Sequence, residues 1–371
     1  GPTPTNHTAD RCVQLKPKAM KKSICFVLFL LFGYGLTCAQ DDTKSIIEEE
    51  VEINVDDLTI SGTFTIPISD KAVPLAILIS GGFADNRDAE AYGLKPFKEL
   101  AWFFAENGIA TYRYDDRGVG KSTGKHTFQY EIAELANDVF AAIRLFKHED
   151  RIDTNKIGLI GHSMGGMMAP MIASMSDDVS FIIALAGSVG EMDKMYLKAR
   201  EKRIKQAGWE EEDIETALEL EKRMVEVTVN GKGSNELIND MRTFSKNRFE
   251  KLPANIRNRY KDWEAYYKPS WYGMMEPYIN TPMMRSFYTH QPKEYLRKVK
   301  CPALFLFAEN DGLIPGSYEG PIIIDAMETA GNYNYTIRQI PHTGHYFSYE
   351  GFFVPGFLNI LTNWIKEQFD Y

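Results

Sequence analysis

Residues 156–170 read Lys156-Ile-Gly-Leu-Ile-Gly161-His-Ser163-Met-Gly165-Gly-Met-Met-Ala-Pro170. The apolar start of this stretch is typical of a buried strand, and the residues after Ser163 are typical of a helix. Glycines two residues before and two residues after the serine leave room for a sharp turn. Such a turn raises the Ser163 hydroxyl above the sheet, at a helix N-terminus whose free N–H groups favour developing negative charge. The stretch therefore predicts a nucleophilic serine, and a plain tight turn is the alternative.

Further short apolar runs on either side predict more strands that are buried on both faces. They occupy residues 74–80, 109–114, 156–160, 181–186, 303–307 and 335–340. Helical patterns lie between them, at about residues 94–107, 129–148, 164–175, 320–331 and 350–368. This alternation predicts an α/β fold with a mostly parallel, doubly wound sheet, in which ligands bind at the carboxyl ends of the strands.

Two segments depart from this alternation. Residues 46–55 and 58–66 alternate polar and apolar side chains, which predicts an antiparallel edge pair with one face in solvent. Residues 188–297 are rich in charge and then in aromatic side chains, and are too long for a simple connection. We expect them to form a helical cap inserted into an α/β core of residues 40–187 and 298–371. The aromatic Trp271 and Tyr272 are expected to contact an apolar part of a substrate, with packing of the cap as the alternative.

A serine becomes a good nucleophile only when a base takes its proton and a carboxylate orients that base. In this kind of fold the acid and then the base follow the serine, each after a later strand. Asp311 stands in the loop directly after the run 303–307 and is preferred to Glu309 as the acid. Loop capping is the alternative role for either carboxylate.

Two histidines follow the last predicted strand, at positions 342 and 345. His345 is preferred as the base, because it lies further into the loop and comes after Gly344, which lets the chain bend back. His342 is expected to be a loop or surface histidine. His162 neighbours the serine, and a packing or substrate-contacting role is expected for it rather than that of the base.

An oxyanion hole needs two backbone N–H donors. One is expected from Met164, the residue after the serine, and the other from the glycine-containing loop after the first buried strand. Gly82 is the first choice in that loop and Phe83 the second; Phe83 is also a candidate for contacting the substrate.

The N-terminal segment is typical of a secretory signal peptide. From Met20 the chain has two lysines, an apolar run from Ile24 to about Leu36, and small residues up to Ala39. The apolar run is shorter than the roughly 20 residues that span a membrane, so a retained membrane anchor is the weaker alternative. Residues 1–19 precede this start and are expected to be a leader or a vector-derived remnant.

Residues 20–39 therefore predict a secreted or periplasmic protein with no stable membrane insertion after cleavage. Cleavage after Ala39 is favoured over lipid attachment at Cys38, because Thr37 stands where a lipoprotein signal has a small apolar residue. Three of the four cysteines fall within residues 1–39, so the mature chain would hold only Cys301 and no intramolecular disulfide.

The net charge of the whole chain is −9, with no long block of one sign, which excludes nucleic acid as an expected partner. Removal of residues 1–39 would make the chain more acidic, which argues against a polyanionic substrate.

Several segments together resemble a bacterial esterase subgroup of the α/β-hydrolase superfamily, similar to the serine aminopeptidase S33 and lipolytic esterase groups. Residues 79–88 resemble its Ser-Gly-Ser-Gly-Pro-x-x-Arg-Asp loop, and residues 112–124 its Asp-x-Arg-Gly-x-Gly-x-Ser segment. Residues 161–166 match its serine turn, and residues 299–311 and 344–345 resemble its acid-bearing strand and its histidine. The resemblance covers roughly 58–186 and 282–368, and departs at Gly82-Phe83-Ala84.

The resemblance implies hydrolysis of small carboxylic esters through an acyl-enzyme, with no metal and no organic cofactor. The leading hypothesis is an exported serine carboxylesterase with Ser163, Asp311 and His345 as its triad. An aminopeptidase or amidase on the same triad is the second hypothesis, with the acidic run 210–213 as a possible holder of a substrate amine. A non-catalytic binding module is the third, and the Ser, Asp and His in chain order argue against it. No oligomeric state is predicted.

Overall fold

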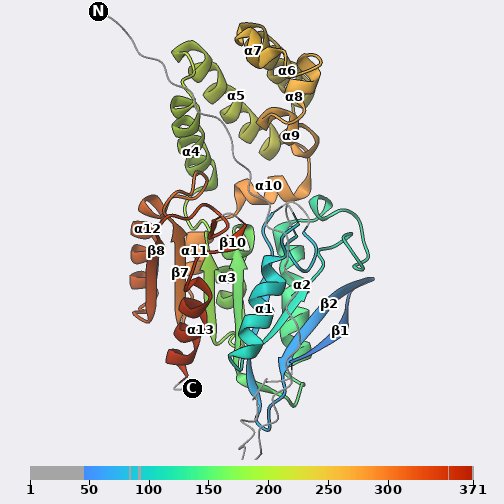
Figure 1. Cartoon of the computed structure of the whole chain (residues 1–371), viewed down its shortest axis with the longest axis vertical. Helices are drawn as coiled ribbons and strands as arrows, with labels where there is room; N and C mark the ends of the chain where they lie inside the picture. The colour runs from blue at the N-terminus through green and yellow to red at the C-terminus, as the bar shows by residue number, and fades with distance from the viewer. Residues whose placement is uncertain (1–45, 83–84, 91–92, 350, 370–371) are drawn as a thin grey trace, which may run out of the picture. The chain divides into compact units, whose positions relative to one another are not determined.

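The computed structural model describes residues 46–82, 85–90, 93–349 and 351–369 (Figure 1). The predicted leader and signal peptide, Cys38, the cleavage site after Ala39, and Phe83 lie outside these residues and stay predictions. All elements below belong to one compact unit.

An eight-stranded sheet forms the core, with the strand order β1-β2-β4-β3-β5-β6-β7-β8. The strands are β1 (Ile46–Val55), β2 (Leu58–Pro67), β3 (Val73–Ile79), β4 (Ala110–Tyr114), β5 (Ile152–His162), β6 (Phe181–Leu185), β7 (Ala303–Ala308) and β8 (Tyr335–Ile340). β2 is antiparallel to both β1 and β4, and every other pair is parallel. The predicted mostly parallel α/β sheet is confirmed.

The strand order reverses at β3. The chain passes from β3 to β4 on one side and later adds β5 on the other side of β3. In open α/β sheets a crevice opens at such a switch point, outside the carboxyl ends of the two strands. The loop after β3 and the turn after β5 therefore meet at the same edge of the sheet. These are the segments that carry Gly82 and Ser163.

Helices cover both faces of the sheet. Helices α1 (Pro96–Glu106) and α13 (Phe357–Gln368) pack on one face, and α2 (Ile132–Phe146), α3 (Met164–Met175) and α12 (Gly316–Thr329) on the other. In β3, Leu75 and Ile77 pack into one layer, whereas Ala76 and Leu78 pack into the other. A strand buried on both faces has no polar face, which is why it appears in the sequence as a continuous apolar run.

Three helices begin at places that the apolar pattern does not mark. Helix α2 starts at Ile132 rather than 129, because Glu131 and Glu134 form a capping box, and a short 3₁₀ turn (Thr127–Gln129) precedes it. Helix α12 starts at Gly316 rather than 320. Helix α13 starts at Phe357 rather than 350, after the small strands β9 (Ser348–Tyr349) and β10 (Phe352–Phe353).

The predicted solvent exposure of the edge pair is wrong for the polar face of β2. β1 is the edge strand and is partly exposed, but Ser61, Thr63 and Thr65 on the polar face of β2 are buried. Arg87 donates hydrogen bonds to Ser61 and Thr63, and Arg113 donates one to Thr65. Guanidinium groups from outside the pair thus cover the face that the alternation assigns to solvent.

Helices fill the chain between β6 and β7, at residues 192–296 (Figure 1). They are α4 (Met192–Gln206), α5 (Glu211–Asn230), α6 (Ser234–Lys251), α7 (Ala254–Arg257), α8 (Trp263–Tyr267), α9 (Trp271–Met275), the 3₁₀ turn η2 (Glu276–Tyr278), α10 (Pro282–Thr289) and α11 (Pro292–Leu296). The short α11 packs against α3 and α12, in the layer that covers the sheet. That residues 188–297 act as a cap remains a proposal.

Arg117 forms a buried ion pair that braces the loop after β4. Its guanidinium donates to the Asp138 carboxylate at 2.7–3.1 Å and to the Glu134 carbonyl at 2.8 Å, and lies 4.6 Å from the centre of the Tyr130 ring. The side chains of Arg117 and Asp138 are only 4% and 2% exposed. Arg117 therefore has an architectural role in this segment.

We expect Arg117→Met to lower the free energy of unfolding by about 3–5 kcal/mol, because it leaves the Asp138 carboxyl buried without its partner. Urea unfolding followed by circular dichroism measures this. Arg151→Met is the matched control, since Arg151 pairs with Glu49 and Glu149 at the surface and is 42% exposed. It should cost no more than about 1 kcal/mol. Equal costs for the two variants would contradict the bracing role.

Candidate active site

Ser163 occupies a strained turn between β5 and α3. Its backbone has φ 54° and ψ −113°, outside the regions that residues with a side chain commonly adopt. The Ser163 N–H donates to the Leu185 carbonyl at 2.8 Å, and the Ser163 carbonyl accepts from the Met167 N–H at 3.1 Å. Bonds to β6 and to the first turn of α3 thus hold the residue in this conformation.

The glycines at 161 and 165 are required by close backbone packing. A Cβ atom on Gly161 would overlap the Gly165 carbonyl, and one on Gly165 would overlap the Ile79 carbonyl. The end of β3, the end of β5 and the start of α3 therefore approach more closely than any side chain allows. This explains the Gly-x-Ser-x-Gly spacing in physical terms.

His345 and Asp311 are hydrogen bonded to one another. His345 Nδ1 lies 2.8 Å from Asp311 Oδ2, and the side chains are 12% and 0% exposed. Burial would raise the pKa of Asp311, but the bond from His345 and those from the Leu313 and Ile314 amides outweigh it and hold the pKa below its usual value. Because an ionised carboxylate only accepts, Nδ1 carries a proton, and in the neutral ring this leaves the lone pair on Nε2.

The competing histidine and carboxylate pair with each other instead. His342 Nδ1 is 3.6 Å from Glu309 Oε2, and these side chains are 91% and 45% exposed. The His342 backbone N–H also donates to Glu309 at 2.8 Å. The structure thus brings Asp311 and His345 together, and leaves Glu309 and His342 at the surface.

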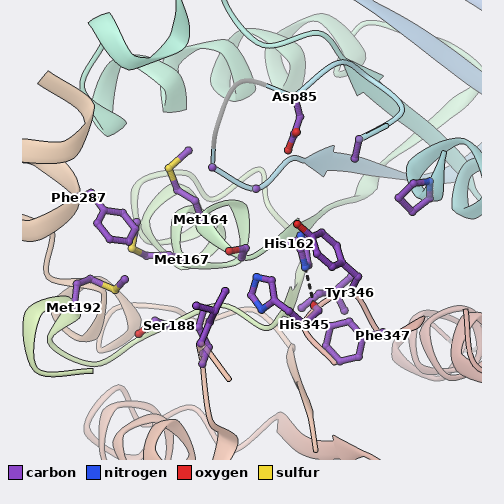
Figure 2. Close-up of a pocket in the computed structure, with 18 of the residues that line it drawn as sticks. Asp85, His162, Met164, Met167, Ser188, Met192, Phe287, His345, Tyr346 and Phe347 are labelled. Carbon is purple, nitrogen blue, oxygen red and sulfur yellow. Dashed lines mark hydrogen bonds between the residues drawn. The ribbon is translucent and has the colours of Figure 1, made fainter. Parts of the chain in front are cut away.

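His162 supports the loop that carries His345. Its Nε2 is 2.9 Å from the His345 carbonyl oxygen, which can only accept, so Nε2 is the donor. Burial lowers the pKa of His162 to about 3, so the ring is neutral at ordinary pH. The two histidine rings lie with their centres 4.9 Å apart, and Tyr346 packs 5.2 Å from His162 (Figure 2).

The loop after β3 is anchored at the end of β4. The Asp116 carboxylate accepts from the Ser80 hydroxyl at 2.9 Å and from the Asp85 backbone N–H at 2.8 Å. Burial raises the pKa of Asp116 to about 7, with these hydrogen bonds acting in the opposite direction. Asp115 accepts the Arg87 backbone N–H at 2.8 Å. Two adjacent carboxylates thus anchor Ser80, Asp85 and Arg87.

Ser163 and His345 line a cavity of about 250 Å³. Figure 2 shows this cavity with His345 among its labelled residues. Gly82, Met164 and His162 also line it, and Met164 is the first residue of α3, where an amide has no acceptor within the helix. Most of the remaining lining is apolar. Seven methionines line it, namely Met164, Met167, Met192, Met195, Met275, Met283 and Met284. No apolar periodicity in the sequence marks this set, which comes from four separate segments.

Trp271 and Tyr272 are not among the described residues that line the cavity. Trp271 donates to Glu221 at 3.0 Å, and Tyr272 donates to the Ala217 carbonyl at 3.1 Å. Both thus pack within the helical insertion, which corrects the expectation that they contact the substrate. Tyr196 and Phe287 are the aromatic residues of the insertion that reach the cavity.

The sequence profile of the family described as "serine aminopeptidase, S33" matches residues 93–350. Esterase EstD of Thermotoga maritima is 28% identical over 159 residues, which cover 42% of this chain and only 37% of that esterase. An uncharacterised 31.7 kDa protein of Escherichia coli is 25% identical over 309 residues, covering 82% of this chain and 95% of that protein. The solved esterase Pf2001 of Pyrococcus furiosus superposes with a TM-score of 0.56 at 16% identity, covering 87% and 91% of the two chains, and shows the fold alone.

Proposed function

Since this chain belongs to the serine aminopeptidase S33 family of α/β hydrolases and is a serine hydrolase of the esterase kind, we propose that Ser163, His345 and Asp311 form its catalytic triad. The observation that carries this proposal is the buried hydrogen bond of 2.8 Å between His345 Nδ1 and Asp311 Oδ2, at the edge of the cavity that holds Ser163. It keeps the His345 ring in the tautomer whose Nε2 can accept a proton.

In the proposed reaction the Ser163 oxygen attacks the ester carbonyl while His345 Nε2 takes the hydroxyl proton. The C–O bond to the alcohol then breaks, and His345 returns the proton to the departing oxygen. A water molecule, deprotonated by the same nitrogen, attacks the acyl-enzyme and releases the acid and free Ser163. Asp311 stays ionised and stabilises the imidazolium that forms in each half of the cycle.

The negative oxygen of each tetrahedral intermediate needs two N–H donors. We assign these to the backbone amides of Met164 and Gly82, which both border the cavity. The position of Met164 at the N-terminus of α3 adds the favourable end of the helix dipole. Since the loop after β3 is anchored through Asp116 and Asp115, its amide needs little reorganisation during the reaction.

The cavity favours a small, apolar acyl group. Its volume of about 250 Å³ lies just below the range for small-molecule sites, roughly 300–1,000 Å³. Methionine side chains are unbranched and polarisable, so a wall built from them adapts to acyl groups of different shape. We therefore propose esters of short to medium acyl chains as the substrate class.

The acidic run considered for an aminopeptidase lies elsewhere. Glu210, Glu211 and Glu212 are exposed at the start of α5, and Asp213 is paired with Arg248 and Lys251. None of the four is among the described residues around the cavity. The run 210–213 therefore gives no support to an aminopeptidase.

We expect p-nitrophenyl acyl esters to be hydrolysed at least about tenfold faster, in kcat/KM, than aminoacyl p-nitroanilides. Among the esters, kcat/KM should rise with acyl length while methylenes fill the cavity, each worth up to about 0.8 kcal/mol. It should then fall once the chain exceeds the available volume. Steady-state kinetics on a series from acetate to palmitate measures both trends. Faster turnover of the anilides would establish an aminopeptidase instead.

Export of the protein stays part of this proposal. It rests on the basic, apolar and small residues in the segment 20–39. Within the described residues, no helix combines the length and the apolar character that crossing a membrane requires.

A further inference from the structure

One acidic side chain, Asp85, lines the cavity around Ser163. The other polar side chains there include Ser188, whose hydroxyl donates to Glu319 at 2.8 Å, and His162 and His345, whose ring bonds are described above. Asp85 therefore stands out as an ionisable group that the proposed reaction does not use, placed among apolar walls. Figure 2 shows its carboxylate directed from the loop toward the cavity.

The carboxylate of Asp85 has few hydrogen-bond partners. The Gly81 backbone amide is one, and no other residue that the structure describes donates to it. An ionised carboxylate can accept about four hydrogen bonds. The neighbouring Asp116 accepts from both a hydroxyl and an amide, although it is the more deeply buried of the two. Asp85 thus keeps free acceptor capacity on the side of the cavity.

Holding the loop does not require this carboxylate. The path of the loop is already set by the Asp85 backbone N–H, which donates to Asp116, and by the Arg87 backbone N–H, which donates to Asp115. Burial also raises the pKa of Asp85 to about 6, against the opposite effect of the Gly81 amide. Asp85 is only partly buried, and carboxylates whose pKa is shifted by a cleft environment cluster at functional sites.

Asp85 lies close to the reacting serine. The position that a Cβ atom on Gly81 would occupy is 3.6 Å from Ser163 Cβ and 3.8 Å from Asp85 Oδ2. Ser163 Cβ and Asp85 Oδ2 thus flank the same point beside Gly81, and an acyl group bonded to the Ser163 oxygen would extend past this point with its second and third carbons on the side of Asp85. A donor on those carbons would also shield the nearby oxyanion from the negative charge of the carboxylate.

We infer that Asp85 selects acyl groups that carry a hydrogen-bond donor, a hydroxyl or an amine, on the second or third carbon. The inference rests on the proposed function, because it assumes that the acyl group is attached to Ser163. It narrows the substrate class to an acyl chain that is apolar at its far end and polar beside the ester carbonyl. The apolar end contacts the methionine wall, and the donor pairs with the single carboxylate.

The test compares four p-nitrophenyl esters of equal chain length: hexanoate, 2-hydroxyhexanoate, 3-hydroxyhexanoate and 2-aminohexanoate. Each is assayed at pH 7.5 with the wild type, Asp85→Asn and Asp85→Leu. For the wild type we expect kcat/KM for the best donor-bearing ester to exceed that for hexanoate by roughly 10- to 100-fold, the range for a hydrogen bond to a charged group. This ratio should fall toward one in Asp85→Leu.

The hydroxy esters and the amino ester distinguish a hydroxyl donor from an amine donor. Asp85→Asn keeps an oxygen that accepts from a hydroxyl but loses the charge that attracts an ammonium, so a loss confined to 2-aminohexanoate identifies an amine. Glu90→Gln is the control, since Glu90 is an exposed carboxylate that pairs with Lys95 and is not among the described lining residues. It should leave all four rates within about twofold.

Two results would overturn the inference. One is a wild type that prefers plain hexanoate, and the other is an equal fall for all four esters in the Asp85 variants, as expected for a purely structural role. Labelling of Ser163 by a fluorophosphonate separates this failure from that of the proposed function. If the wild type is labelled and hydrolyses hexanoate, only the assignment of Asp85 is lost. If Ser163 is not labelled, the proposed function itself fails.

Discussion

Ser163→Ala is expected to lower kcat/KM for p-nitrophenyl hexanoate by about 10⁴- to 10⁶-fold, and to abolish labelling by a fluorophosphonate. The substitution removes the only atom that forms the acyl bond. The residual rate comes from substrate binding and from the amides of Met164 and Gly82, which remain in place. Steady-state kinetics and in-gel detection of the label measure the two effects.

The loss must be distinguished from unfolding, because Ser163 occupies a strained turn with φ 54°. A smaller alanine side chain fits the same backbone, so the melting temperature should stay the same or rise slightly. Ser174→Ala is the matched control. Ser174 lies in α3, the helix that follows Ser163, donates to the Met171 carbonyl at 2.7 Å and is not among the described lining residues. It should keep kcat/KM within about twofold. Undiminished labelling of Ser163→Ala would show that another group is the nucleophile.

His345→Ala is expected to lower kcat/KM by about 10³- to 10⁶-fold, whereas His342→Ala should change it by less than about twofold. The difference follows from position alone. The two histidines are separated by two residues in the chain, but His345 is buried against Asp311, and His342 is 91% exposed. Kinetics of both variants at pH 7.5, with circular dichroism as the folding check, tests this prediction.

The carboxylates provide a second matched pair for the same test. Asp311→Asn should lower kcat/KM by about 10³- to 10⁴-fold, because the amide no longer holds His345 in the tautomer that accepts the serine proton. Glu309→Gln loses only a surface contact with His342 and should be nearly silent. A silent His345→Ala, or equal losses at 309 and 311, would contradict the proposed triad.

The course of the sheet could be predicted from periodicity. The central strands are buried on both faces, so each appears as a short, continuous apolar run, and the helices between them follow from the alternation. The face of β2 that bears Thr63 and Thr65 was predicted wrongly. Arg87 and Arg113 cover this face of β2 with their guanidinium groups. The positions of these two residues depend on strand pairing and on the course of a loop, and no local sequence pattern encodes the pairing or the loop.

The residues of the candidate triad could likewise be predicted only in part. The order of serine, acid and histidine at successive strand ends makes Ser163, Asp311 and His345 the preferred choices, and the structure brings Asp311 and His345 into contact. In the sequence, only the position within each loop favours Asp311 over Glu309 and His345 over His342. Burial and the hydrogen bond of 2.8 Å provide the physical distinction.

The cavity could not be predicted. Trp271 and Tyr272 were natural candidates because they are aromatic, yet they pack within the insertion. The methionines that line the cavity come from α3, α4, the end of α9 and α10, and Asp85 comes from the loop after β3. Residues on separate elements share a cavity only through the angles at which those elements pack, and a single sequence carries no local signal of such angles.

The sequence by itself determined the α/β class of the core, the serine turn and the chain order of the reactive groups, because each depends on residues that are neighbours in the chain. Only the tertiary structure decided which side chains surround Ser163. It placed His162 under the His345 loop, paired His342 with Glu309 at the surface, and left Asp85 as the one acidic side chain among the described residues of the cavity wall. These outcomes depend on burial and on contacts between segments far apart in the chain, which exist only once the sheet and its helices have packed together.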